Sequence, residues 1–453
     1  MNSNFRNRFP TRRDRARRSH RSIVAQLVAT VVATVVATAL VACGDRRPKG
    51  DGPYASIVAD AVPRIEEQLG LPFKSPPKLE TRARDDVSKF LMQQLTSERA
   101  KKQIEGQQAV YRLLGLSPDT LELGVLLQRL LEEQVIGYYD PSAKVLYVVD
   151  GAPKALLQQT VTHELVHALQ DQYINVDSMQ RQTDDNDAQG AAQAVLEGQA
   201  VYTQLLVDPN SGPMVRMPGG WDRIRDAIRD GQGGMPVFSS APRAVREGLL
   251  FPYLGGADFV RRFADKRPMK ELLSDLPRSS RQILNDAAYF TDDKSQREIP
   301  TPVTLPVPTG GTVLYANSFG EFETRLVLVQ HLKDEGLARR GASGIDGDRY
   351  AVIRTAQGNA VAWASVWDTS VDAADFMDLL ADATRRRYEM KRPTVPAGVT
   401  SRRLDVPAGK THGARTVTLS VEQRQGRPVV FFMDTPAGIS ASLIDPARLT
   451  IGH

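Results

Sequence analysis

Two histidines four residues apart restrict what this chain can fold into more than any other feature. Residues 160–171 read TVTHELVHALQD, in which apolar residues surround His163, Glu164 and His167. On an α-helix, residues four positions apart lie on the same face, so both imidazoles would point to one side of a buried helix. Two neutral imidazoles with a glutamate beside them can hold Zn²⁺ and accept a proton from the water that the metal activates. The segment therefore predicts a helical zinc site; the alternative is a structural histidine pair.

A catalytic zinc ion needs a third protein ligand and an open fourth position. The sequence offers no further histidine near this segment. Glu197 is the strongest candidate, because it lies in the apolar helical run AVLEGQA, where a carboxylate is costly unless it is paired or bound to a cation. The small residues Gly198 and Ala200 would let this helix approach the histidine helix closely. The alternatives are Glu132 and Glu133, which fit surface charges on the preceding helix.

These segments resemble two groups of known proteins. HELVH at 163–167 with EGQA at 197–200 resembles the gluzincin metallopeptidases, the broad class of thermolysin and aminopeptidase N. EQVIGYYDP at 133–141, together with residues 163–172, resembles a family of uncharacterised bacterial lipoproteins to which metallopeptidase activity is ascribed. The second resemblance covers roughly residues 60–300 and, more weakly, 315–380.

The gluzincin resemblance implies a set of roles and a fold. Zn²⁺ would be held by His163, His167 and Glu197, with Glu164 as the general base. The fold would be α+β, with a zincin-like, mainly helical catalytic domain that contains a small β-hairpin or sheet. The chain departs from the class in two ways. Glu197 follows His167 by 30 positions, further than in thermolysin or aminopeptidase N, and the amine-recognition motif of aminopeptidases (Gly-x-Met-Glu-Asn) is absent. The second departure argues against aminopeptidase activity.

Three further segments carry supporting predictions. The β-type runs within 134–149 predict a hairpin. The gluzincin resemblance implies an edge strand before the zinc helix to which a peptide adds by main-chain hydrogen bonds, and this hairpin is placed to supply it. FPYLGG at 251–256 resembles the Tyr-x-x-Gly segment of aminopeptidase-type enzymes, which implies that Tyr253 donates to the developing oxyanion. The alternative for Tyr253 is a buried structural tyrosine. Asp171, one helical turn after His167, either orients a ligating histidine or is an ordinary helix carboxylate.

The amino-terminal segment predicts export and a lipid anchor. Residues 1–42 contain eight arginines and one acidic residue, and 23–42 is an uncharged, largely apolar stretch. This pattern describes a secretory signal peptide; an uncleaved membrane anchor is the alternative. Leu40-Val41-Ala42-Cys43 resembles the bacterial lipobox, and Cys43 is the only cysteine of the chain. The resemblance implies a signal peptide at 1–42, a lipid on Cys43 and a tether at 43–56, in the bacterial cell envelope and outside the cytoplasm.

The rest of the chain predicts two domains, separated near 297–311 by a stretch rich in proline and glycine. Residues 57–300 would form the zincin-like domain, and 301–453 a smaller α+β domain of unknown role. The first would contain helices at 54–131, 153–173, 188–207 and 241–290. The second would contain helices at 318–338 and 371–388, with strands near 349–354, 361–367, 400–406, 415–422 and 427–433.

These features predict a membrane-anchored, extracytoplasmic zinc metallopeptidase that acts on a peptide or protein. Beyond residue 42 the chain has 50 basic and 52 acidic residues, so nucleic-acid binding has no electrostatic support. The competing hypotheses are a non-catalytic zincin-fold lipoprotein that binds an envelope partner and a metal-free structural envelope protein. Glu164 favours catalysis, because a protein that only binds has no need of a base there.

Overall fold

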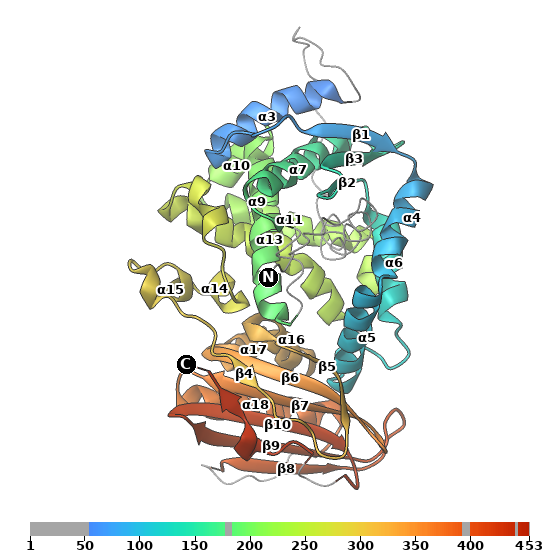
Figure 1. Cartoon of the computed structure of the whole chain (residues 1–453), viewed down its shortest axis with the longest axis vertical. Helices are drawn as coiled ribbons and strands as arrows, with labels where there is room; N and C mark the ends of the chain where they lie inside the picture. The colour runs from blue at the N-terminus through green and yellow to red at the C-terminus, as the bar shows by residue number, and fades with distance from the viewer. Residues whose placement is uncertain (1–53, 177–183, 392–398, 440–442, 453) are drawn as a thin grey trace, which may run out of the picture.

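The computed structural model describes residues 54–176, 184–391, 399–439 and 443–452 (Figure 1). The predicted signal peptide, Cys43 and most of the predicted tether lie outside these residues. The described chain combines helices with sheets and so has the α+β class that the sequence predicts. None of the helices in these ranges is both long and apolar enough to span a membrane.

A three-stranded sheet supports the predicted zinc helix. β2 (Gly137–Asp140) and β3 (Val145–Val149) form an antiparallel hairpin, which confirms the hairpin expected within 134–149. β1 (Lys78–Arg82) pairs in parallel with β3, so the order is β1-β3-β2 and β2 is an outer strand. We expected mostly helix at 54–131, so β1 was missed. Its side chains are exposed or half-buried and give no apolar pattern, and its partner strand is distant in the sequence.

Helices cover both faces of this sheet. On one face, α3 (Ala55–Leu69) and α7 (Lys154–Tyr173) pack against alternate residues of β3 in one apolar cluster. On the other face, the remaining residues of β3 join α4 (Arg84–Leu95) and α6 (Leu123–Gln134) in the main core. Because β3 is buried on both sides, it anchors α7 firmly to the sheet.

Two long helices, α9 (Asn186–Val207) and α13 (Arg243–Lys266), cross where two glycines meet. A Cβ added to Gly198 would overlap the backbone of Gly256, and one added to Gly256 would overlap the backbone of α9. We expected Gly198 to bring α9 close to the histidine helix. That prediction is wrong, because the close neighbour of Gly198 is α13. Ala200 does share an apolar cluster with α7, so α9 is held between α7 and α13.

Shorter helices complete this part of the molecule. They are α5 (Glu98–Leu113), α10 (Ser211–Arg216), α11 (Gly220–Gly231), α12 (Pro236–Ser240), α14 (Ser280–Leu284) and α15 (Asp286–Tyr289). The helical block expected at 241–290 is divided among α13, α14 and α15. Pro268 and Pro277 lie between these helices, where they interrupt the helical backbone.

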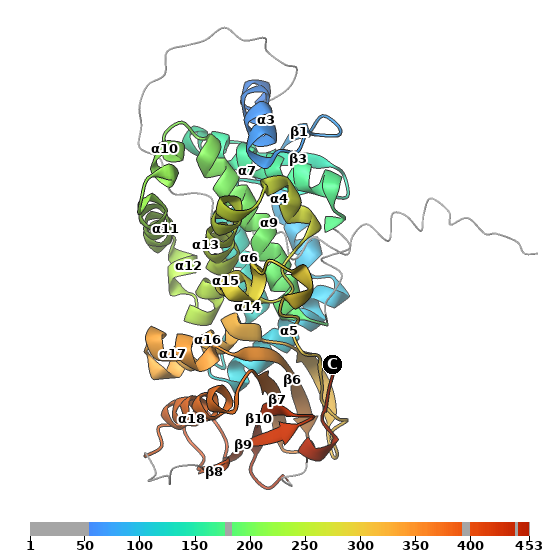
Figure 2. The ribbon, with the colours of Figure 1, turned by 90° about the vertical axis from the view of Figure 1, so that its left-hand side faces the viewer.

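A six-stranded antiparallel sheet forms the other end of the molecule (Figure 2). Its strand order is β5-β6-β7-β10-β9-β8. In that order the strands are β5 (Thr312–Asn317), β6 (Ile345–Thr355), β7 (Gly358–Trp367), β10 (Arg427–Pro436), β9 (Arg415–Arg424) and β8 (Ser401–Val406). Five of them match the expected strands, and β5 was not predicted.

Helices cover one face of this sheet and a two-stranded ribbon the other. The helices are α16 (Gly320–Leu332), α17 (Glu335–Ala342) and α18 (Ser370–Arg387). The ribbon pairs β4 (Val303–Thr304) with β11 (Thr450–Ile451). The single helix expected at 318–338 is divided, because Lys333 has a φ of 59° and ends α16.

Hydrogen bonds connect the start of α9 to the C-terminal part of the molecule, which contains the six-stranded sheet. The backbone N–H of Asn186 donates to the side-chain oxygen of Asn317 at 2.6 Å. The Ser318 hydroxyl donates to Asp185, which is the N-cap of α9, also at 2.6 Å. Because α9 also carries Glu197, the C-terminal part helps to position a helix that bears a predicted metal ligand.

Candidate metal centre

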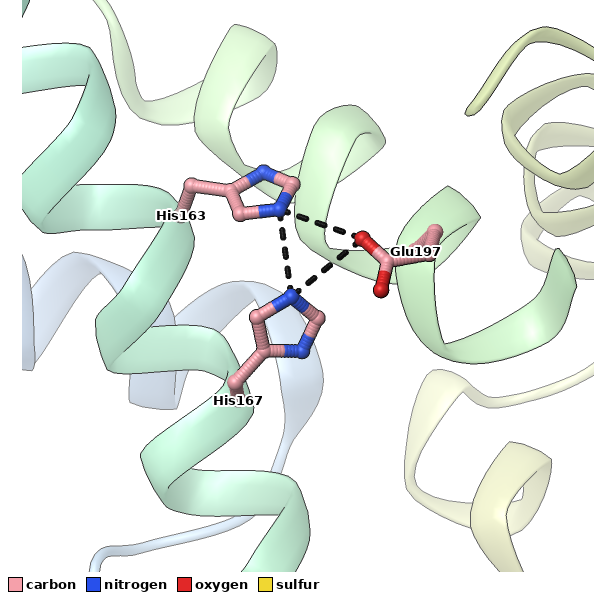
Figure 3. Close-up of side chains that lie close together, drawn as sticks. All are labelled: His163, His167 and Glu197. Atoms are coloured by element: carbon pink, nitrogen blue, oxygen red, sulfur yellow. Dashed lines mark hydrogen bonds and ion pairs between the residues drawn. The ribbon is translucent and has the colours of Figure 1, made fainter. Parts of the chain in front are cut away.

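The predicted zinc helix is α7, which confirms the helix expected at 153–173. Its packing with α3 against one face of the sheet explains the apolar residues around the motif. His163 and Glu164 are buried, whereas 12% of the His167 side chain is exposed. Both imidazoles point from α7 toward Glu197 on α9 (Figure 3). The site is therefore most accessible on the His167 side.

Three ligand atoms meet between α7 and α9. Oε2 of Glu197 is 3.3 Å from Nε2 of His163 and 3.3 Å from Nε2 of His167, and the two nitrogens are 3.1 Å apart (Figure 3). A tetrahedral zinc ion with bonds of about 2.0–2.1 Å holds its ligand atoms about 3.3 Å apart. Within the described residues, this is the group of histidines and carboxylates that could hold a metal ion. The spacing fits one face of a tetrahedron, which leaves the fourth corner for water or substrate.

Two glutamines orient the imidazoles. The amide nitrogen of Gln170 donates to the Leu196 carbonyl at 2.9 Å, so its amide oxygen faces Nδ1 of His167, at 2.9 Å. An amide oxygen only accepts hydrogen bonds, so Nδ1 carries the hydrogen and Nε2 faces the site. The amide oxygen of Gln204 makes the same contact with Nδ1 of His163, at 3.0 Å. Both imidazoles thus present the nitrogen that a metal ion would bind.

The charges of the three groups depend on one another. Burial disfavours a charge on His167, but Glu197, with help from the Glu164 carboxylate and the Gln170 hydrogen bond, raises the pKa of His167 to about 9. Burial also opposes the charge on Glu197, yet the two imidazoles, His167 more strongly, lower its pKa to about 2. Ligand atoms this close need a positive charge between them, which a proton or a metal ion can supply. At neutral pH, a metal ion that binds here has to displace a proton.

Glu164 lies beside the ligand group without belonging to it. Its carboxylate accepts the backbone N–H of Tyr139 in β2. Burial raises the pKa of Glu164 above its ordinary value, against the lowering effects of His167 and His163. A carboxylate whose pKa is raised can accept a proton and hold it, as a general base must.

The structure gives Asp171 other partners than the histidines. Its carboxylate accepts the Tyr139 hydroxyl at 2.8 Å and forms an ion pair with Lys144. Of the two alternatives for Asp171, the ordinary helix carboxylate fits, and the prediction that it orients a histidine is corrected. The residues that orient the imidazoles, Gln170 and Gln204, were missed. The first lies three residues after His167 on the same helix, a spacing that could have pointed to it.

Tyr253 lies in the middle of α13 and packs beside the site. Its ring centre is 6.3 Å from that of His163, and the two ring planes are 25° apart. The side chain is completely buried. This geometry fits the alternative of a structural tyrosine, which supports the His163 ring. Donation from Tyr253 to an oxyanion stays a prediction.

The alternative ligands Glu132 and Glu133 have other contacts. Glu132 is exposed on α6 and accepts a hydrogen bond from Gln128. Glu133 accepts the backbone N–H groups of Val237 and Phe238 at the start of α12. Neither belongs to the ligand group, so the geometry favours Glu197 as the third ligand.

Comparison with known proteins bears on the C-terminal part alone. A family model described as a domain of unknown function, DUF8575, matches residues 312–437. The match begins at β5 and ends just after β10, so it contains the six strands of the larger sheet. No curated protein and no solved structure matches the chain. The metal centre lies outside the matched residues. The comparison therefore says nothing about its chemistry, which has to be inferred from its geometry.

Proposed function

We propose that this chain is a zinc-dependent metallopeptidase of the gluzincin type. The observation that carries the proposal is the meeting of three ligand atoms at tetrahedral spacing, with the non-ligating Glu164 beside them. Histidine nitrogen and carboxylate oxygen are ligands that zinc prefers, and two histidines with one glutamate leave a position open, as catalytic zinc requires.

The proposed chemistry divides the work among four residues. His163, His167 and Glu197 would hold Zn²⁺, which lowers the pKa of water and polarises a carbonyl. Glu164 would take the proton of the attacking water and deliver it to the departing amine. Its buried position suits both steps, because burial raises its pKa and favours the protonated form after the first transfer.

The surroundings are consistent with a zincin-like catalytic domain at residues 57–300. β2 is an outer strand, and the backbone N–H of its Tyr139 contacts Glu164. A peptide that added to this edge by main-chain hydrogen bonds would therefore lie beside the proposed base. The same edge could orient a polypeptide substrate across the metal centre.

The main competing function is a zincin-fold protein that binds a partner in the envelope and does not cut. Glu164 argues against it. This buried carboxylate is not part of the ligand group, and burial of such a group is costly unless it serves a purpose. A binding protein would gain nothing from that cost.

We also propose that the enzyme is held at a bacterial membrane surface by a lipid on Cys43, in the extracytoplasmic envelope. The support comes from the lipobox-like sequence around the lone cysteine. Mass spectrometry of the mature protein is expected to find Cys43 as the first residue, with a lipid attached. An unmodified Cys43 in the mature native protein would contradict the anchor and leave the zinc proposal unaffected.

Removal of the metal tests the proposed activity. The purified protein is expected to contain about one zinc ion per chain. A chelator should abolish cleavage of a peptide mixture, and one equivalent of Zn²⁺ should restore it. Zinc binding without any cleavage would favour the competing function. A native protein that contains no metal, and does not take up added zinc, would instead support the metal-free structural alternative.

A further inference from the structure

A groove reaches to within one helical turn of Glu197 along α9. Its cavity of about 260 Å³ is lined by α5 and α6 on one side, by α9 and α13 on the other, and by α16 at one end. Figure 1 shows how these helices are placed. On α9, the lining begins at Gln193, one helical turn before Glu197, and continues through Asp187 to Asn186. At 1.5 Å per residue, Asp187 lies about 15 Å along α9 from Glu197. The groove therefore leads from the vicinity of the metal centre toward the C-terminal sheet.

The walls of the groove combine apolar side chains with amides. The apolar ones include Ile104, Leu127, Leu249 and Phe322. The glutamines form two pairs, Gln103 and Gln107 on α5 and Gln189 and Gln193 on α9. Since residues four apart share a helix face, each pair lines the groove lengthwise. Amides both donate and accept hydrogen bonds, so they suit the N–H and C=O groups of an extended peptide.

A carboxylate lies at the end of the groove formed by the C-terminal part. Glu323 on α16 is half-buried in the lining, and its Oε1 accepts the Tyr111 hydroxyl at 3.1 Å. Burial raises the pKa of Glu323 to about 7, opposed by the Tyr111 hydrogen bond and supported by the charge of Asp348. Neither of these neighbours is a cation. Neither Tyr111 nor Asp348 therefore neutralises the charge of Glu323, and a basic group that enters the groove could do so.

The basic residue of the described lining, Arg99, lies far from this carboxylate. It is near the start of α5, about 18 Å along the helix from Tyr111, which contacts Glu323. The groove is thus basic toward one end and acidic at the other. A ligand with one positive side chain would be bound in a single direction.

We propose that this groove binds an extended polypeptide segment of the substrate, in which a lysine or arginine side chain reaches Glu323. The inference rests on the proposed peptidase function. An extended chain rises about 3.3 Å per residue, so the distance of about 15 Å from Glu197 to Asp187 accommodates four or five residues. The substrate class is then a polypeptide with apolar residues near the cleaved bond and a basic residue about four or five positions away.

Peptide binding to the full chain carrying Glu164→Gln tests this proposal without cleavage. Fluorescence anisotropy would compare labelled eight-residue apolar peptides that contain one lysine, moved along the sequence, with peptides that contain norleucine instead. With the lysine at the favoured position, we expect the norleucine peptide to bind about tenfold more weakly. The added change Glu323→Gln should remove this difference, whereas Glu98→Gln, at an exposed glutamate on α5, should preserve it.

Two results of the binding experiment overturn the proposal. One is equal binding of the lysine and norleucine peptides at every position, and the other is a preference for lysine that persists in Glu323→Gln. Cleavage by the unsubstituted chain distinguishes this proposal from the proposed function. Cleavage with no preference for basic residues would contradict the groove assignment alone. A lysine preference in binding that depends on Glu323, without any cleavage, would support the groove and contradict the peptidase function.

Discussion

Replacing Glu164 with glutamine is expected to leave about one zinc ion per chain and to lower kcat for peptide cleavage by about 10²- to 10⁴-fold. Glutamine has nearly the shape of glutamate but cannot accept the proton of the attacking water. Glu164 is not one of the three ligand residues, so its replacement should leave the metal in place. Elemental analysis and kcat measured on one peptide, for the same preparations, test both parts of the expectation.

The matched control for this prediction is Glu132→Gln. Glu132 is an exposed carboxylate on α6 whose described contact is with Gln128. Zinc content and kcat should both remain as in the unsubstituted chain. If Glu164→Gln retains more than about a tenth of the original kcat, the group is not the general base. If it loses zinc, Glu164 is a ligand and the assignment of roles is wrong.

Replacing Glu197 with glutamine should impair the protein in a different way, because it should weaken zinc binding itself. A neutral amide is a poor substitute for a carboxylate ligand, and only two imidazoles would remain. The change also removes the negative charge that raises the pKa of His167. We expect zinc affinity to fall by more than about a hundredfold, beyond the effect usual for a residue that only orients a ligand. Titration with zinc in competition with a chelator measures it.

Gln204→Leu provides the graded comparison. Gln204 contacts Nδ1 of His163 and does not belong to the ligand group, so its loss should lower zinc affinity by about 10- to 100-fold. The order of affinities should therefore be the unsubstituted chain, then Gln204→Leu, then Glu197→Gln. Full zinc affinity in Glu197→Gln would mean that the third ligand lies elsewhere, and the gluzincin assignment would fail at that residue.

The spacing of residues along the sequence was enough to predict that His163 and His167 share one face of a buried helix. The interval between His163 and His167 matches a turn of helix, and the apolar residues around them match a helix buried on a sheet. Glu197 could be inferred because a carboxylate in an apolar helical run demands a positive partner. Nothing in the sequence, however, set the distance between α7 and α9. That distance depends on β3 on one side and on the glycine contact with α13 on the other.

The glutamines that orient the imidazoles show why the rest was missed. A glutamine carries no charge, so its burial is not conspicuous in a sequence. Gln204 is 41 positions from the histidine that it contacts, and that contact exists only once α7 and α9 have packed. Asp171 attracted attention because it is charged and close to His167. Its partners come instead from the hairpin, Tyr139 in β2 and Lys144 in the turn.

Strand prediction succeeded where the pairing is local or the apolar pattern is strong. β6, β7, β9 and β10 have buried alternate or continuous positions and turn residues between successive strands. β1 has neither property. Its pairing with β3 is parallel and non-local, and its side chains are exposed or half-buried. The contact of the C-terminal part with the start of α9 was equally hidden, since it rests on one hydrogen bond that Asn317 accepts from Asn186 and one that Ser318 donates to Asp185.

Anomalous X-ray scattering at the zinc absorption edge, from crystals of the purified native protein, tests the central claim most directly. The account predicts one strong peak between α7 and α9, about 2.0–2.2 Å from Nε2 of His163, Nε2 of His167 and a carboxylate oxygen of Glu197. The carboxylate of Glu164 should lie near the peak without coordinating it. A zinc-replete crystal with no peak at this position, or with a peak held by other residues, would contradict the account.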